Sequence, residues 1–135
     1  MRNLTCSSSP PFVGRISDWY KANNVGTDFD PGVSFVKEAY NFYKKMDYKT
    51  IVMGASVRST EQIAALCGCD YLTISPALIK ELEQSEGTLE RKLLTLSVDT
   101  EMQNNHVNMT EASYKKEVSE NTMASEKLLS GIQEF

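Results

Sequence analysis

The sequence predicts an α/β fold in which short parallel strands alternate with helices. Residues 50–53 and 71–74 are two short, unbroken apolar runs, which is typical of strands covered on both faces. Apolar residues at helical spacing precede the first run, separate the two runs and follow the second. Because helices and strands in this order build parallel sheets with crossover helices, we predict such a sheet here.

Length and composition indicate one compact domain. The chain has 135 residues, of which 41% are hydrophobic, and this is enough for a single core. Its net charge of −4 argues against a surface that binds nucleic acid. No stretch approaches the roughly 18 consecutive apolar residues of a membrane span, and the first residues lack the apolar run of a signal peptide. We therefore expect a cytoplasmic protein with no membrane partner.

The first eleven residues are expected to be irregular. They end in Pro10 and Pro11, which lack the N–H donors that a strand uses. The predicted α/β unit follows over residues 12–94, and its first helix is a short one near residues 16–23.

Three later helices in this unit have clear start signals. Each is preceded by a side chain that can accept a hydrogen bond from the first helical turn, and two have proline at the first helical position. The predicted N-cap residues are Asp30, Ser59 and Ser75. The first of these helices should run to about residue 46, and Gly68 suits a left-handed end of the second. The third should bury Leu78, Ile79 and Leu82.

The carboxyl-terminal part is less regular. Residues 95–121 are mostly polar and match neither period, so we predict a loop there. A last helix is expected over residues 122–135, with Thr122 as its N-cap.

The carboxyl end of the strand at residues 50–53 is the predicted binding position, because loops and helix N-termini converge at this end of parallel strands. Ser56 supplies a hydroxyl, Arg58 supplies a fixed fork of donors, and the following helix supplies a partial positive charge. These groups suit a phosphate, and Arg15 is a second candidate of the same kind. The alternative is that Ser56 caps the turn and Arg58 forms a surface ion pair.

The same end of the predicted sheet offers no nucleophile or acid–base group. The lysines fall on helices or before a strand, and no two carboxylates are usefully spaced. His106 is the one histidine, and it has no cysteine or acidic neighbours that would make it a metal ligand or a base. We therefore predict no catalytic residue and no metal site. No glycine-rich dinucleotide or triphosphate loop is present.

Four separate segments, in matching order and spacing, resemble transaldolase. They are residues 12–20 (Phe-Val-Gly-Arg-Ile, then Asp-Trp-Tyr), 30–33 (Asp-Pro-Gly-Val), 50–58 (Thr-Ile-Val-Met-Gly-Ala-Ser-x-Arg) and 68–76 (Gly-Cys-Asp-Tyr-Leu-Thr-Ile-Ser-Pro). The resemblance is to the carboxyl-terminal part of that enzyme. It implies a partial TIM (β/α)8 barrel made of about the last two or three strand–helix units and the C-terminal helices.

The resemblance also implies an activity and a set of ligands. Transaldolases of the pentose phosphate pathway move a dihydroxyacetone unit between sugar phosphates through a lysine Schiff base, without a metal or a dissociable cofactor. The implied sugar phosphates are sedoheptulose 7-phosphate, fructose 6-phosphate, erythrose 4-phosphate and glyceraldehyde 3-phosphate. Ser56 and Arg58 match the family's phosphate-binding Ser-x-Arg motif, and Arg15 matches the arginine of its Phe-Val-Gly-Arg motif.

The chain also departs from the family pattern. The Schiff-base lysine, the proton-relay glutamate and the first-strand aspartate of the family lie upstream of the segments found here, so we expect a truncated form that keeps phosphate-binding residues without the chemistry. Pro10 stands where the family has serine, and residues 115–121 replace its Trp-x-His-Asn segment. The alternative hypothesis is a non-catalytic sugar-phosphate-binding or assembly module that self-associates, or pairs with a complementary half barrel, through an open sheet edge.

Overall fold

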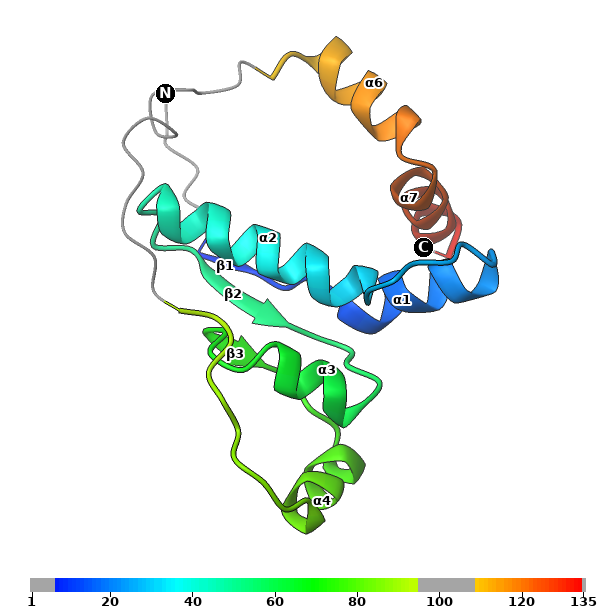
Figure 1. The fold of residues 1–135 in the computed structure, drawn as a ribbon. Coiled ribbons are helices and arrows are strands. Elements are labelled where there is room, and N and C mark those ends of the chain that lie inside the picture. Colours follow the sequence, from blue (N-terminus) through cyan, green and yellow to red (C-terminus); the bar gives the residue numbers. More distant parts are fainter. Residues whose placement is uncertain (1–6, 95–108, 135) are drawn as a thin grey trace. The chain divides into compact units, whose positions relative to one another are not determined.

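The computed structural model describes residues 7–94 and 109–134. Within these ranges the chain contains a three-stranded parallel sheet and six helices (Figure 1). The chain forms two compact units, Met1–Gln103 and Asn104–Phe135. The first unit holds the sheet and has the α/β order that the sequence predicts.

The sheet has strand β2 (Ile51–Gly54) at its centre, between β1 (Ser8–Ser9) and β3 (Tyr71–Leu72). Both neighbours run parallel to β2. Strands β2 and β3 confirm the two predicted strands, although β3 ends two residues earlier than expected.

The prediction of an irregular segment before the first helix is wrong at strand β1. The Ile51 N–H donates to the Ser7 carbonyl at 3.1 Å, and the Ala55 N–H donates to the Pro11 carbonyl at 2.9 Å. Prolines lack an N–H but keep their carbonyl groups, so they can still accept hydrogen bonds from a neighbouring strand.

Helix α1 (Val13–Ala22) begins earlier than predicted. Its first amides are satisfied by the loop that follows β2, since the Val13 N–H donates to the Ala55 carbonyl at 2.9 Å and the Gly14 N–H to the Ser56 carbonyl at 3.1 Å. The first four N–H groups of a helix have no partner inside it, so these distant carbonyls replace a local cap.

Helices α2 (Pro31–Lys45), α3 (Thr60–Ala65) and α4 (Pro76–Gln84) confirm the three predicted starts. In each, the predicted N-cap side chain accepts a hydrogen bond from the amide three residues later: Asp30 from Val33 at 3.0 Å, Ser59 from Gln62 at 3.4 Å and Ser75 from Leu78 at 3.5 Å. Gly68 has a φ of +103°, the left-handed conformation expected in the turn after α3.

The core of the first unit lies among β2, α1, α2 and α3. Its most deeply buried apolar side chains are Tyr40, Leu66, Val13, Val36 and Val52. Leu93, from the segment after α4, joins this core, and the amides of Lys92 and Leu93 both donate to the Cys67 carbonyl, at 2.8 and 2.9 Å. Leu78 and Leu82 pack half-buried against the core as predicted. Ile79 does not, because it lies 44% exposed on α4.

One face of the sheet is covered less than the sequence predicts. Ile51 and Met53 lie on the same face because side chains alternate along a strand, and Tyr71 is the register partner of Met53. Ile51 is 39% exposed and Tyr71 is 60% exposed, whereas Val52 on the opposite face is fully buried. The prediction of strands covered on both faces is therefore wrong within the described residues.

The second unit contains helices α6 (Glu111–Glu120) and α7 (Thr122–Glu134). Helix α6 lies inside the region predicted as a polar loop. Local polar contacts account for it: Thr110 and Ser113 cap its start reciprocally, and the Lys115 ammonium lies 2.6 Å from the Glu111 carboxylate one turn earlier. Residues 95–108, and with them His106, lie outside the described residues.

Helix α7 confirms the predicted last helix, but its cap is one residue earlier than expected. The side-chain oxygen of Asn121, rather than Thr122, accepts the Ala124 N–H at 3.0 Å. The end of the predicted helix at Phe135 lies outside the described residues. None of the helices in the described part of the chain is long and apolar enough to cross a membrane.

Gly32 supplies a test of how closely α1 and α2 pack. A Cβ atom added there would lie 2.1 Å from the Val13 carbonyl oxygen and 2.7 Å from the Ser17 hydroxyl oxygen. We expect Gly32→Ala to lower the free energy of unfolding by about 1–3 kcal/mol, because the helices must separate. Urea unfolding measures this. Gly26→Ala is the control, since nothing lies within 4 Å of its added Cβ, and an equal loss in both variants would contradict the prediction.

Candidate functional site

The loop that follows β2 lies against the first turn of α1. The carbonyls of Ala55 and Ser56 accept the first two amides of that helix. The structure therefore brings the loop with Ser56 and Arg58 next to the turn that contains Arg15, three residues that the sequence predicts to share a site.

Gly14 is the point of closest approach. A Cβ atom added there would lie 2.0 Å from the Ser56 carbonyl oxygen and 2.8 Å from Cγ of Arg58. Real Cβ atoms do not come this close to other heavy atoms, so any other residue at this position would force the helix and the loop apart. The close approach of the helix to the loop thus explains why the Phe-Val-Gly-Arg segment has glycine at this position.

Ser56 has a backbone conformation that is uncommon for residues other than glycine. Its φ is +57°, in the left-handed region, and the residue is half-buried. Such a conformation costs on the order of 1 kcal/mol and persists only where surrounding contacts impose it. The hydrogen bond from the Gly14 N–H to its carbonyl is one such contact.

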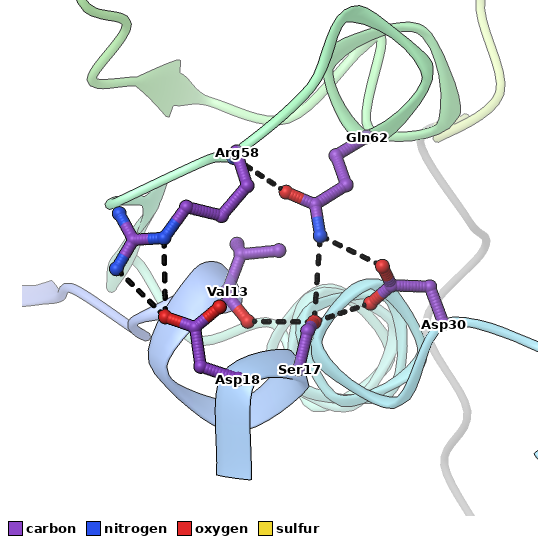
Figure 2. Close-up of polar contacts among 6 residues, drawn as sticks. All are labelled: Val13, Ser17, Asp18, Asp30, Arg58 and Gln62. Carbon is purple, nitrogen blue, oxygen red and sulfur yellow. Dashed lines mark hydrogen bonds and ion pairs between the residues drawn. The ribbon is translucent and has the colours of Figure 1, made fainter. Parts of the chain in front are cut away.

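Arg58 forms the surface ion pair that the sequence leaves as an alternative. Its Nε and Nη2 groups donate to the same Asp18 carboxylate oxygen, at 3.1 and 2.9 Å (Figure 2). Both side chains are about half exposed. The Arg58 backbone N–H donates to the side-chain oxygen of Gln62 at 2.7 Å, so this amide is already occupied.

Arg15 is exposed and has a different partner from Arg58. Its guanidinium carbon is 4.6 Å from the centre of the Phe12 ring, which is a cation–π distance. The structure thus brings together the backbone segments of the three predicted residues, while the guanidinium groups of Arg15 and Arg58 have different partners.

A polar cluster formed by the buried Ser17 and Gln62 and the half-buried Asp30 is absent from the sequence-based prediction. Figure 2 shows Gln62 between the loop and the N-terminus of α2. Its amide nitrogen donates to Asp30 at 2.7 Å and to Ser17 at 3.4 Å, and Ser17 lies 2.7 Å from the other Asp30 oxygen. No local pattern in the sequence indicates this cluster, because Gln62 and Asp30 are 32 residues apart in the chain.

The hydrogen bonds in this cluster hold the pKa of Asp30 below its usual range. Burial alone raises the pKa of this carboxyl, but four donors stabilise its charged form and outweigh burial. They are the Gln62 side chain, the Val33 amide, the Ser17 hydroxyl and the Gly32 amide. The cluster therefore contains a carboxylate that stays charged at neutral pH.

Among residues 7–94 and 109–134, no three histidine, cysteine, aspartate or glutamate side chains gather closely enough to hold a metal ion. The arginines described here are Arg58, which pairs with Asp18, and Arg15 in the adjoining turn of α1, which lies at cation–π distance from Phe12. Such groups can bind an anion through side-chain hydrogen bonds.

Residues 5–135 match the sequence model of the family described as transaldolase/fructose-6-phosphate aldolase. The chain belongs to this family. The match confirms the resemblance to transaldolase, and the matched range includes the Phe-Val-Gly-Arg and Ser-x-Arg segments.

Individual relatives agree with the family match. A transaldolase of Rhizobium etli is 50% identical over 129 residues, which cover 93% of this chain and 39% of the relative. A transaldolase of Yersinia pseudotuberculosis is 50% identical over the same length, with 93% and 40% covered, and one of Rhizobium leguminosarum is 51% identical, with 93% and 39% covered. The chain thus spans about two fifths of the length of the transaldolases it matches.

Acid should weaken the fold through Asp30. Because the folded-state pKa of Asp30 is lowered, its contribution to stability is complete above the unfolded-state pKa of about 3.9 and is lost as the pH falls through the folded-state pKa. Urea unfolding between about pH 5 and pH 2 measures it. Asp30→Asn keeps an N-cap but cannot titrate, so its stability should fall less steeply in acid. Parallel curves for the two proteins would contradict this assignment.

Proposed function

We propose that the chain binds the phosphate group of sugar phosphates through Arg15, Ser56 and Arg58. One observation carries this proposal: the first turn of α1, which contains Arg15, is hydrogen-bonded to the loop that contains Ser56 and Arg58. Two guanidinium groups and a hydroxyl then belong to adjoining segments at the carboxyl end of a parallel strand, a usual position for phosphate in α/β barrels.

The phosphate contacts proposed here come from side chains more than from helix amides. The first two amides of α1 donate to loop carbonyls, and the Arg58 amide donates to Gln62. Helix α3 has six residues, so its dipole is small. The sequence predicts that Ser56, Arg58 and the partial charge of the helix after β2 act together; we propose that the side chains contribute more than the helix does.

Family membership supports sugar phosphates as the ligand class and a partial TIM barrel as the architecture. The relatives are transaldolases, and the resemblance implies that Arg15, Ser56 and Arg58 belong to the phosphate site of the family. We propose that the chain supplies these contacts and not the covalent step, because neither the loop between β2 and α3 nor the first turn of α1 contains a lysine. Lys44, which is 21% exposed, pairs at 2.8 Å with Asp70, and Asp70 precedes β3 at the opposite end.

Calorimetric titration with fructose 6-phosphate tests the proposal. Arg58→Met should weaken binding at least about tenfold, because a charge-assisted hydrogen-bond donor is lost, and Ser56→Ala should weaken it less. Lys49→Met is the matched control. It removes one positive charge from a largely exposed lysine before β2, and it should leave the affinity unchanged.

Two results of the same titration would contradict the proposal. Unchanged affinity in Arg58→Met, or no binding by the wild-type chain, would overturn the proposed site. Adding borohydride to the mixture tests the covalent part, and a mass increase on any lysine would show that the chain forms a Schiff base.

The open sheet face favours a second candidate function, assembly with another copy of the chain. Ile51, Met53 and Tyr71 form an apolar patch on one face, and β1 and β3 are the outer strands of the described sheet. Exposed apolar faces and free strand edges promote pairing between chains.

Light scattering measures the mass in solution and decides this candidate. We expect a dimer or a larger species for the wild-type chain, and Tyr71→Glu should shift it to monomer because a charge would enter the apolar patch. Phe29→Glu is the control, since Phe29 is equally exposed, at 62%, but lies between α1 and α2. A stable wild-type monomer would contradict the candidate.

A further inference from the structure

We infer that Asp18 is a positioning residue that orients the Arg58 guanidinium for phosphate. The inference rests on the proposed function, because it concerns the same anion site. It depends on three observations: which edge of the guanidinium Asp18 occupies, how the Arg58 stem is held, and how exposed the pair is.

Asp18 occupies one edge of the guanidinium and leaves another open. A guanidinium presents a side edge, formed by Nε and Nη2, and an end edge, formed by Nη1 and the second hydrogen of Nη2. The bonds to Asp18 come from Nε and Nη2, which is the side edge. The end edge keeps the parallel pair of donors that suits a phosphate.

The Arg58 stem lies close to Gly14. Cγ and Nε of Arg58 lie 2.8 and 2.9 Å from the position that a Gly14 Cβ would occupy, so the stem runs along the glycine backbone. The backbone amide of Arg58 is held by Gln62. With its amide bonded and its stem next to the Gly14 backbone, this side chain keeps most of its freedom in the guanidinium, and the bonds to Asp18 restrict the direction of that group.

The exposure of the pair argues against a role in holding the fold together. The two side chains are 47% and 48% exposed, and ion pairs of this exposure contribute little to stability. Asp18 and Arg58 also belong to elements already joined by the backbone bonds between α1 and the loop. The pair therefore acts on the direction of the guanidinium more than on the stability of the loop.

The negative charge of Asp18 also repels a phosphate. Asp18 can therefore either strengthen or weaken phosphate binding, and measuring which occurs tests the inference. Ordering a long, flexible side chain before the ligand arrives removes an entropic cost from binding. Repulsion between Asp18 and a phosphate is reduced by solvent at these exposures. The ordering effect is the larger one, and loss of Asp18 weakens binding.

Titration of the full chain with fructose 6-phosphate, together with the Arg58 Nε–H signal in a proton–nitrogen NMR spectrum, tests the inference. Asp18→Ala should weaken binding about three- to tenfold and shift the Nε–H signal, with the urea midpoint unchanged. Asp18→Asn keeps an acceptor oxygen and should restore most of the affinity. Glu90→Ala, which breaks the exposed pair with Lys92, is the matched control and should change none of these quantities.

The outcomes separate this inference from the proposed function. If Arg58→Met loses binding while Asp18→Ala keeps the wild-type affinity, the site stands and the positioning role is wrong. Tighter binding by Asp18→Ala would mean that the carboxylate competes with phosphate, which also overturns the role. If the wild-type chain does not bind fructose 6-phosphate, the proposed function fails and the positioning role fails with it.

Discussion

The close approach of Gly14 to the loop after β2 is the constraint on which the rest of the site depends. It lets the first amides of α1 reach the loop carbonyls, and those bonds replace a cap that the local sequence does not supply. The same contact holds Ser56 in its left-handed conformation and gives the Arg58 stem a surface to follow. Because Gly14 has no Cβ, the start of α1, the left-handed turn at Ser56 and the stem of Arg58 can all lie close together.

Gln62 holds the same loop through hydrogen bonds. It is buried, and its two amide ends satisfy different elements, with the oxygen accepting from the Arg58 backbone and the nitrogen donating to Asp30 at the start of α2. Within the described residues, no buried side-chain nitrogen or oxygen lacks a hydrogen-bond partner. A fully satisfied buried cluster strongly favours one arrangement of its members, because a shift that breaks one bond leaves a buried polar group unpaired.

Short-range signals made much of the fold predictable, and long-range contacts explain what was missed. The caps Asp30, Ser59 and Ser75 act within their own helices, so the sequence located them correctly. The start of α1, strand β1 and the Asp18–Arg58 pair depend on partners roughly 40 residues away or more, and no local pattern encodes them. The site loop was found because a family motif and the rule for parallel strand ends both indicated it.

The two charged pairs near the ends of β2 differ in exposure and in how far their charges serve the fold. At the amino end, the Asp70 carboxylate accepts hydrogen bonds from the Lys44 ammonium and the Val52 amide. The Lys44 and Asp70 side chains are only about one fifth exposed, so this ion pair serves to join α2 to the sheet. At the carboxyl end, Asp18 engages one edge of Arg58 in a half-exposed pair. An ion pair with donors left over, at a strand end where loops converge, can accept an anionic ligand without breaking a contact that the fold requires.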